Sequence, residues 1–332
     1  MNKLISIVIP TLNNESEITA FFNSIGKQSY PKSRIEIVAV DGGSTDGTLK
    51  QLKKYNAKIY FNKYILAEPG VSLGIEKARG DLIMIMAMDN FYYHPDDLQK
   101  MVATFENPSI YAAFPKQNYD QTDNLFTKYH NTFTDPFNHF VQGDAANART
   151  FHRVYKTLLH TEVYDVYDFS KSKIIPMISF SQGFTLRGNY KKDKKDLFDD
   201  NKPVIELIKN NKKIAFVHAV SIYHHTIRDL KHFIKKQRWA TQNALEQKNY
   251  GIAHRYKTLS AEQKLKIKLW PIYSLSIIFP LLNSLRGFII DREKLWFFHP
   301  LNCLFCAYAN FIQLMAFIIG KIGYQTKNVS RN

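Results

Sequence analysis

Short apolar runs alternate with amphipathic stretches along the first hundred residues of the chain. Four runs of mainly β-branched and other apolar residues predict buried strands, at residues 4–10, 34–41, 58–62 and 81–88. Between the first two runs the apolar residues recur on one helical face, at Ile18, Phe21, Phe22 and Ile25. Strands that alternate with helices predict a parallel sheet and an α/β domain with a mononucleotide-type half.

Beyond residue 110 the pattern is less regular. Residues 144–159 and 203–211 are predicted as helices, residues 213–225 as one or two strands, and residues 230–245 as a basic amphipathic helix. The charged stretch around residues 191–202 is predicted as a loop.

Two long uncharged stretches lie near the C-terminus. Residues 269–285 are interrupted by two prolines, and residues 295–320 are long enough to cross a bilayer. Trp270 and Trp296 stand near their starts, where interfacial aromatic residues are expected. We therefore expect residues 241–332 to form a membrane-associated helical region. The alternative is a pair of buried core helices.

Whether these segments span the bilayer or lie in its interface is left open by the sequence. Two spans would leave Arg286, Arg292 and Lys294 outside, against the tendency of basic residues to stay on the cytosolic side. A re-entrant or surface-lying hairpin avoids this conflict. The lysines at 264, 266 and 268 would then lie against anionic headgroups.

Composition and charge narrow the class of protein. The chain has 332 residues, 45% of them hydrophobic and 14% aromatic, which excludes a disordered protein. The net charge of +16 favours an anionic partner, namely nucleic acid, a phosphorylated substrate or an acidic membrane surface. Cys303 and Cys306 lie in an apolar stretch and are expected to pack as small apolar side chains. The N-terminus lacks the pattern of a signal peptide, so the catalytic part is expected in the cytosol.

Polar residues follow three of the four predicted strands. Thr11 and Asn13 follow the first, Asp41 ends the second, and Asp89 and Asn90 follow the fourth. In open α/β sheets, ligands bind beyond the carboxyl ends of the strands, so these residues are candidates for one site. Strand ends also need turn-forming residues, which is the alternative for each of them taken alone.

The order of several motifs resembles inverting glycosyltransferases of family 2 with the GT-A fold. They are "SIVIPTLNNE", "VAVDGGSTDGT", "GIEKARGDLIMIMAMDN", "FDDNKPVIELIKNNKKIAF", "SIYHH" and "QRW". The resemblance implies a Rossmann-like mixed sheet flanked by helices, over residues 1–240, followed by C-terminal apolar helices. Residues 1–110 would be the nucleotide-binding half and residues 111–240 the acceptor half. The chain lacks the glycine motifs of dinucleotide oxidoreductases and of P-loop NTPases.

The resemblance implies that the loop after the first strand and the end of the second bind the nucleotide. Pro10 would fix the backbone there, and Thr11 and Asn13 would offer hydrogen bonds. Asp41 would accept a hydrogen bond from the nucleotide base. The acid that the family often has directly after its Asn stands one residue later here, at Glu15. Asn14, by its residue type, is a candidate to cap the first helix.

The resemblance also implies a divalent cation, Mn²⁺ or Mg²⁺, after the fourth strand. The family commonly has a D-x-D motif there, but in this chain Ala87 replaces the first acid and Asp89 keeps the second. His224 corresponds to a further metal ligand, with His225 as its competitor, and Asn90 would bind the metal weakly or contact the sugar. The alternatives are a turn-capping carboxylate and a strand-end imidazole.

An acidic pair at the start of a helix corresponds to the family's general base. Asp200 would remove the proton from the acceptor hydroxyl, and its neighbour Asp199 would help to raise its pKa. Alternatively, both acids only favour the helix N-terminus. Lys236 and Arg238 would contact a diphosphate or a lipid-linked phosphate, unless they form a solvated basic face of their helix.

These observations predict a metal-dependent inverting glycosyltransferase on the cytoplasmic face of a membrane. Its partners would be a nucleotide-sugar donor, a polyprenyl-linked glycan acceptor and the membrane surface. The alternatives are direct transfer to a polyprenyl phosphate and a degenerate nucleotide-binding scaffold, which Ala87 suggests. A nucleic-acid partner is not expected, because the basic residues form no recognisable nucleic-acid-binding module.

Overall fold

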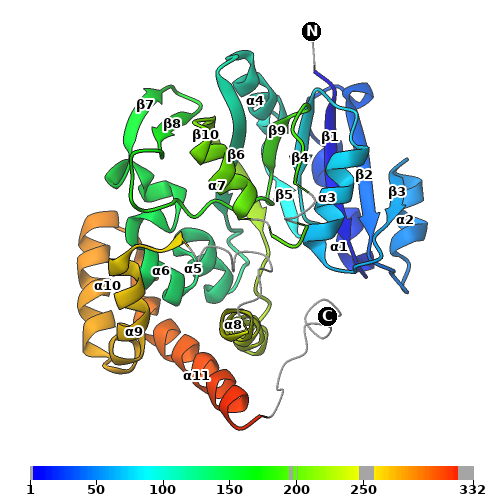
Figure 1. Cartoon of the computed structure of the whole chain (residues 1–332). Helices are drawn as coiled ribbons and strands as arrows, with labels where there is room; N and C mark the ends of the chain where they lie inside the picture. Colours follow the sequence, from blue (N-terminus) through cyan, green and yellow to red (C-terminus); the bar gives the residue numbers. More distant parts are fainter. Residues whose placement is uncertain (1–2, 194–196, 200, 247–257, 321–332) are drawn as a thin grey trace.

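A mixed β-sheet with helices on both faces forms the centre of the computed structural model (Figure 1). The structure describes residues 3–193, 197–199, 201–246 and 258–320. Within them the strand order is β3 (Lys58–Phe61), β2 (Ile35–Asp41), β1 (Ile5–Thr11), β4 (Leu82–Ile85), β9 (Phe184–Arg187), β6 (Ile110–Asn118), β10 (Lys213–His224), β8 (Asp165–Asp168) and β7 (Lys156–His160). A short strand, β5 (Asn90–Tyr92), pairs with β10 off this path.

The direction of the strands changes along the sheet. The strands β3, β2, β1 and β4 are parallel, as the alternation of strands and helices predicted. The strand β9 then runs antiparallel to both of its neighbours, β4 and β6. The sheet is therefore the mixed sheet that the family resemblance implied. Since β9 lies between strands from the first 118 residues, both predicted halves contribute to one sheet, and the boundaries at residues 110 and 240 stay predictions.

Helices cover both faces of this sheet. The helices of this part of the chain are α1 (Glu15–Gly26), α2 (Thr48–Lys54), α3 (Ala67–Lys77), α4 (Asp97–Ala103), α5 (Leu125–Phe133), α6 (Pro136–Gln142), α7 (Lys202–Lys209) and α8 (Leu230–Leu245), with short 3₁₀ turns η1 (Lys32–Arg34), η2 (Thr104–Glu106), η3 (Gly143–Ala145) and η4 (Ala148–Arg153). Of these, α6 and α8 pack mainly against the C-terminal helices and not against the sheet. The apolar face predicted for α1 is buried in one core, together with the side chains of β1 and β4 that point to the same face of the sheet as α1. Helices α3 and α7 contribute to a second core, which contains the side chains of β1 and β4 that point the other way.

Two predictions for individual elements were wrong in part. The fourth strand was predicted to residue 88 but ends at Ile85, and a turn follows in which the Asn90 amide donates to the Ala87 carbonyl at 3.2 Å. Residues 144–159 were predicted as one helix. They instead form η3, η4 and the start of β7, because Lys156–His160 pairs with β8. Pairing with a distant strand here overrides a local pattern that is compatible with a helix.

The C-terminal region packs as a helical unit beside α6 and α8 (Figure 1). It consists of α9 (Ala261–Leu275), α10 (Ile278–Asp291), the 3₁₀ turn η7 (Lys294–Phe298) and α11 (His299–Ile318). Cys303 and Cys306 are buried against Phe233 and Trp270, which confirms that they pack as apolar side chains.

The lengths of these helices bear on the membrane prediction. Residues Lys294–Ile318 are long and apolar enough to cross a bilayer, and a third of their most apolar window is buried in the protein. Helices α9 and α10 pass the same test only as a pair, and they meet at 98°. The bend falls at Ile277, which has a φ of 60°. The bend falls inside the predicted stretch 269–285, so that stretch is not one straight helix, and a hairpin formed with residues 295–320 stays a prediction.

Candidate functional site

Strand pairing brings the predicted nucleotide-binding residues to one edge of the sheet. The strands β1 and β2 are parallel, and Thr11 stands opposite Asp41 in their register. Both side chains are buried at the carboxyl ends of their strands. Pro10 comes one residue earlier in β1, close to the first turn of α3 at Gly70. The sequence prediction that these residues share an edge is therefore confirmed, while their role in nucleotide binding stays a prediction.

The Asp41 carboxylate is held by the turn that follows it. Its Oδ2 accepts from the backbone amides of Gly43 at 2.8 Å and Ser44 at 3.0 Å, and its Oδ1 accepts from the Ser44 hydroxyl. These bonds are the turn-forming role that the sequence offered as the alternative. They also fix the carboxylate in one orientation at the strand end.

The loop after β1 is tied to the loop after β2. The Asn13 side chain, on a backbone with a φ of 53°, accepts from the Thr45 amide at 2.9 Å. Glu15 Oε2 accepts from the Gly47 amide at 2.9 Å, and a Cβ at Gly47 would lie 2.0 Å from the Glu15 carboxylate. Glu15 therefore holds the neighbouring loop in place.

Asn14 behaves differently from the prediction. Its side chain does not cap α1, because it accepts from the Thr11 hydroxyl at 2.9 Å and from the Leu12 amide at 3.0 Å. The side chain thus stabilises the end of β1 instead of the start of the helix.

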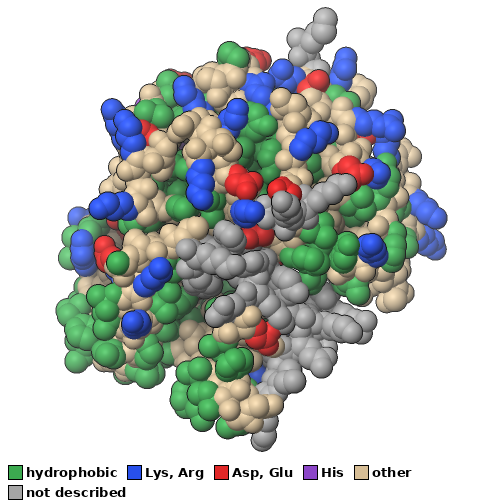
Figure 2. Space-filling model, in the orientation of Figure 1, with side chains coloured by type: hydrophobic (Ala, Val, Ile, Leu, Met, Phe, Trp, Pro, Cys, Tyr) green, Lys and Arg blue, Asp and Glu red, His purple; other side chains and the backbone are tan. Residues whose placement is uncertain are grey.

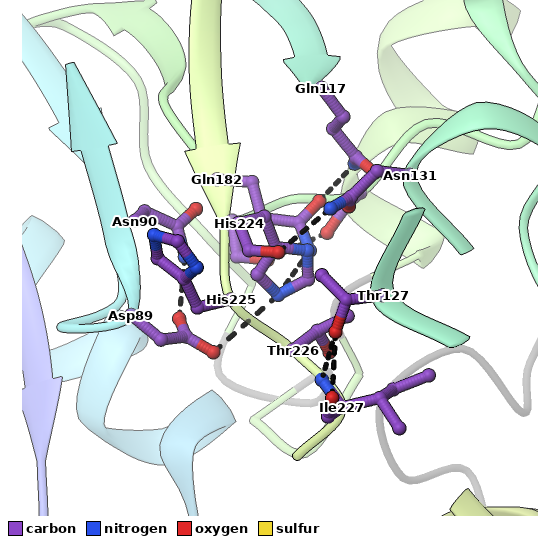
Figure 3. A network of polar contacts seen from close by, with 12 residues as sticks. Asp89, Asn90, Gln117, Thr127, Asn131, Gln182, His224, His225, Thr226 and Ile227 are labelled. Carbon is purple, nitrogen blue, oxygen red and sulfur yellow. Dashed lines mark hydrogen bonds and ion pairs between the residues drawn. The ribbon is translucent and has the colours of Figure 1, made fainter. Parts of the chain in front are cut away.

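Asp89 and His224 meet across a second part of the same edge (Figure 3). Asp89 precedes β5, His224 ends β10, and β5 pairs with β10 so that Asn90 stands opposite His224. His224 Nε2 lies 3.5 Å from Asp89 Oδ2. Burial alone would raise the pKa of Asp89, but the charges of His224 and Lys236 and a hydrogen bond from Asn90 together hold it below its usual value. The carboxylate is therefore ionised at neutral pH.

Hydrogen bonds from two further segments fix the position of His224 (Figure 3). Asn131 on α5 donates to the His224 carbonyl at 2.7 Å, and Gln182 Nε2 lies 3.2 Å from His224 Nδ1. His225 instead contacts Asp123, with Nδ1 at 2.6 Å from Oδ1. Of the two competing histidines, His224 is thus the one beside Asp89.

The residues around Asp89 fit a divalent cation. Two ligands of an octahedral ion at about 2.1 Å lie roughly 3 Å apart, which is close to the separation of the Asp89 and His224 atoms. Asn90 is fully buried beside them, and its Oδ1 has no hydrogen-bond partner among the described residues. A buried amide oxygen without a partner costs free energy unless a ligand or a water satisfies it.

Lys236 and Arg238 point to different surroundings. Lys236 Nζ donates to the Thr226 hydroxyl at 2.6 Å, and burial lowers its pKa while Asp89 and Asp135 raise it. Arg238 Nε donates to Gln313 on α11 at 3.2 Å. Side chains two positions apart on a helix point in different directions. Lys236 is therefore near the Asp89 site, whereas Arg238 contacts the C-terminal helix.

The predicted catalytic acids lie at the start of α7. Asp199 is buried, and its Oδ1 accepts from the amides of Asn201 and Lys202 at 2.8 Å each. It therefore performs the role of favouring the helix N-terminus that the sequence offered as the alternative for both acids. Asp200, the predicted general base, lies outside the described residues.

Sequence reasoning missed Gln117, His130 and Gln182. Gln182 contacts both His224 and Gln117, and burial, with Lys236 and His224 as lesser causes, holds the pKa of His130 well below its usual value. The only sequence signal near Gln182 is the glycine that follows it; in the structure Gln182 and Gly183 both have positive φ, directly before β9. A Gln-Gly pair before a strand marks such a turn. Only the fold, however, brings that turn to β10.

A large cavity lies between η4 and the α9–α10 hairpin. It has a volume of about 830 Å³, and its lining includes apolar side chains (Phe140, Phe279, Leu282, Ile290 and Trp296), basic ones (Arg149, Arg153, Lys266 and Arg286) and acidic ones (Asp144, Asp291 and Glu293). Arg153 pairs with Asp144 and Asp291. No ion pair holds Arg149 or Arg286 within the described part of the chain.

Arg149 connects this cavity to the Asp89 site. Its guanidinium donates to the Gln117 carbonyl at 2.9 Å, and the Gln117 side chain contacts Gln182, which contacts His224. A smaller cavity of about 170 Å³, lined by Gln117, His130 and Gln182 among others, lies along this connection. The large cavity is thus joined to the Asp89 site through Arg149 and a short series of contacts.

Comparisons with known proteins agree with this architecture. Residues 6–168 match the family model described as glycosyl transferase family 2. A poly(ribitol-phosphate) β-N-acetylglucosaminyltransferase of Staphylococcus aureus is 34% identical over 92 residues, which are 26% of this chain and 16% of that protein. A dolichyl N-acetyl-α-D-glucosaminyl phosphate 3-β-D-2,3-diacetamido-2,3-dideoxy-β-D-glucuronosyltransferase of Methanococcus voltae is 38% identical over 109 residues, 31% of this chain and 34% of that protein. The chain thus matches only a minor part of these relatives' length.

One solved structure resembles nearly the whole chain. It is a mannosyltransferase of Pyrobaculum calidifontis in complex with GDP-Man and Mn²⁺, with a TM-score of 0.54 and 13% identity, covering 95% of this chain and 88% of that one. At this identity the likeness shows the fold alone.

Proposed function

Because the chain carries a glycosyltransferase family 2 domain over residues 6–168, we propose that it is a metal-dependent, inverting glycosyltransferase. It moves a sugar from a nucleotide-sugar donor to a membrane-bound, polyprenyl-linked glycan. The observation that carries the proposal is that the Asp89–His224 pair lies at the carboxyl ends of the strands and is connected to a cavity lined by both apolar and charged side chains.

The donor would lie along the carboxyl ends of the parallel strands. Thr11 and Asp41 stand side by side there, at the position where open α/β sheets bind nucleotides. Asp89, His224 and Asn90 would hold the cation, and Lys236 adds a positive charge beside them. When bound, Mn²⁺ or Mg²⁺ neutralises the negative charge of the departing diphosphate.

The chain's own residues would supply the proton transfer. Asp200 would remove the proton of the acceptor hydroxyl, whose oxygen then forms a bond to the anomeric carbon as the bond to the diphosphate breaks. One such displacement inverts the anomeric centre. Asp199 accepts two backbone amide hydrogens, so it would hold the start of α7 in place.

Attachment to the cytoplasmic face of a membrane would bring the acceptor to this site. Figure 2 shows hydrophobic side chains gathered over α9, α10 and α11, and the structure leaves Ile278, Ile289 and Phe311 more than half exposed. An exposed apolar surface of this extent is typical of a membrane or protein contact. The right-angle bend between α9 and α10 supports a hairpin that lies in the interface.

The large cavity supports an amphiphilic acceptor. Phe279, Leu282 and Ile290 of α10 line it, and Arg149 and Arg286 in the same lining suit a lipid-linked phosphate. The Methanococcus relative is named for transfer to a dolichyl-linked sugar phosphate. A relative from Rhizobium johnstonii, 31% identical over 115 residues, is named a dodecaprenyl-phosphate galacturonate synthase. Both acceptor types remain within the proposal, and the product distinguishes them.

The test is a turnover assay with purified protein, Mn²⁺, a panel of nucleotide sugars and extracted polyprenyl lipids. We expect one donor to be consumed only when metal and lipid are both present. A lengthened lipid-linked glycan supports the proposal, and a single sugar on phosphate supports direct transfer to a polyprenyl phosphate. Consumption of no donor under any of these conditions contradicts transferase activity.

The scaffold alternative rests on Ala87 and has its own test. A scaffold would bind nucleotide weakly whether or not a divalent cation is present, and Asp89→Ala would leave that binding unchanged. We expect instead that Mn²⁺ strengthens nucleotide binding in the native chain and that Asp89→Ala removes this effect.

A further inference from the structure

A second group of side chains that could hold a metal ion lies toward the β7 end of the sheet, on β7, β8 and β10. It consists of His160, Asp165 and His218, whose ligand atoms all lie within 4.8 Å of one another. Within the described residues, no other group of three His, Cys, Asp or Glu side chains gathers in this way. The proposed transferase reaction makes no use of it.

Strand register explains why these three side chains meet. His160 on β7 stands directly opposite Asp165 on β8, so both side chains point to the same face of the sheet. Asp165 in turn stands opposite Phe216 on β10. His218 comes two residues after Phe216 and therefore shares that face. Antiparallel pairing thus places one carboxylate between two imidazoles.

Within the group, a ring nitrogen of each histidine faces the Asp165 carboxylate. His160 Nδ1 lies 2.6 Å from Asp165 Oδ1, and His218 Nε2 lies 4.0 Å from the same oxygen. Asp165 Oδ2 accepts from the Tyr167 hydroxyl at 3.1 Å, which fixes the orientation of the carboxylate. His218 Nε2 donates to the Thr161 carbonyl at 3.2 Å, and a bound metal would take the place of that proton.

This ligand set selects a class of metal. Two imidazoles and one carboxylate suit Zn²⁺ and similar transition metals, whereas Mg²⁺ and Ca²⁺ prefer oxygen ligands. Zinc ligands at about 2.1 Å in a tetrahedron lie roughly 3.4 Å apart, within the range of separations found here. Three protein ligands leave a fourth position for water. His160 is largely exposed, so the ion can enter from solvent.

We propose that His160, Asp165 and His218 form a zinc site separate from the Asp89 site. The group of ligand atoms that lie within 4.8 Å of one another contains neither Asp89 nor His224, so the two sites do not share these ligands. A bound Zn²⁺ would link β7 and β8 to β10. The strand β7 is the last strand of the sheet, and all five of its residues are exposed. A bound ion would therefore stabilise this edge strand.

The test measures Zn²⁺ binding to the metal-stripped full chain by isothermal titration calorimetry, with no nucleotide present. We expect one Zn²⁺ per chain and a rise in the melting temperature on binding. Replacing His218 by Ala or Asp165 by Asn should weaken binding about 100-fold or more, because one of three protein ligands is lost. Co²⁺ in place of Zn²⁺ should give the visible absorption of a tetrahedral site.

Three controls make the result specific. His152→Ala removes another exposed histidine, on η4, and should leave Zn²⁺ binding unchanged. Asp89→Ala should also leave it unchanged, which separates this site from the one used by the proposed transferase. Circular dichroism of the zinc-free variants checks that they fold. Zn²⁺ binding that is absent, or that survives both His218→Ala and Asp165→Asn, overturns the proposal and leaves a plain His–Asp ion pair.

Discussion

His224 Nε2 lies 3.5 Å from Asp89 Oδ2, although the two residues belong to distant parts of the sequence. The pairing of β5 with β10 creates this contact, since Asn90 stands directly opposite His224. The contact turns a single strand-end carboxylate into a pair of possible metal ligands beside a buried amide. Several predictions about metal use depend on this pair.

The position of Ala87 predicts how metal affinity depends on the donor. With one carboxylate in place of two, the site is less negative, so we expect Mn²⁺ to bind measurably only when a nucleoside diphosphate supplies further oxygens. Ala87→Asp should allow Mn²⁺ to bind without nucleotide. Calorimetric titration with and without UDP or GDP measures both effects, and tight Mn²⁺ binding by the native chain alone would contradict the prediction.

Replacing each of the two neighbouring histidines tests which one serves the metal. His224→Ala should lower metal-dependent turnover by about 10- to 100-fold, because a ligand beside Asp89 is lost. His225→Ala is the matched control, since His225 pairs with Asp123 instead, and it should keep most of the turnover. Steady-state rates across a range of Mn²⁺ concentrations separate weaker metal binding from a general loss. Equal effects of the two changes would remove His224 from the site.

The two acids before α7 are expected to have different roles. Asp200→Asn should abolish turnover and leave nucleotide affinity nearly intact, because only proton removal is lost. Asp199→Asn weakens the bonds to the Asn201 and Lys202 amides and should cost about 1 kcal/mol of stability. Turnover and thermal melting measured on both variants test the division, and retained turnover in Asp200→Asn would move the base to Asp199 or elsewhere.

The exposed apolar residues of α10 are predicted to contact the membrane. Changing Ile278, Leu281 and Ile289 together to Ser should lower binding to vesicles of mixed neutral and anionic lipids about 100-fold, from the apolar area no longer buried. Leu158→Ser with Leu159→Ser removes exposed apolar side chains from β7 and serves as the control. Co-sedimentation measures binding. A triple variant that binds vesicles as well as the native chain would place the contact elsewhere.

The pH dependence of stability should report His139. Burial lowers the pKa of His139 to about 4, although Asp144 and Asp291 oppose the shift. An unfolded histidine titrates near 6.5, so between these values the unfolded state binds more protons. Stability should therefore fall as the pH drops from 6.5 toward 4, by at most about 1.4 kcal/mol per pH unit for this residue, and gain nothing above 6.5.

Urea unfolding at pH 7, 6 and 5 measures this slope. Burial also lowers the pKa of His130, His232 and His299, so the native slope contains all four histidines. His139→Gln should reduce the slope of the unfolding free energy against pH, by an amount that corresponds to the uptake of at most one proton, since Gln does not titrate. An unchanged slope in that variant would show that His139 is not buried in its neutral form.

The strands β1 and β2, which end at Thr11 and Asp41, were predictable from sequence, and so was the buried apolar face of α1. Apolar runs and helical spacing act locally, and both fix which side of an element is buried. The helix predicted at residues 144–159 failed because β7 forms only by pairing with β8, and no local signal records that pairing. Gln182 was missed for the same reason, because its contact with His224 depends on how β9 is placed.

The sequence by itself determined the α/β pattern, the strand-end acids, the missing first carboxylate at Ala87 and the apolar C-terminal stretches. These features follow from residue type and short spacing, which one stretch of chain contains in full. Only the tertiary structure decided that His224 and not His225 faces Asp89, that Arg238 contacts α11, and that His160, Asp165 and His218 converge. Each of these depends on the register between strands or the packing of distant helices, and register is set by the whole sheet at once.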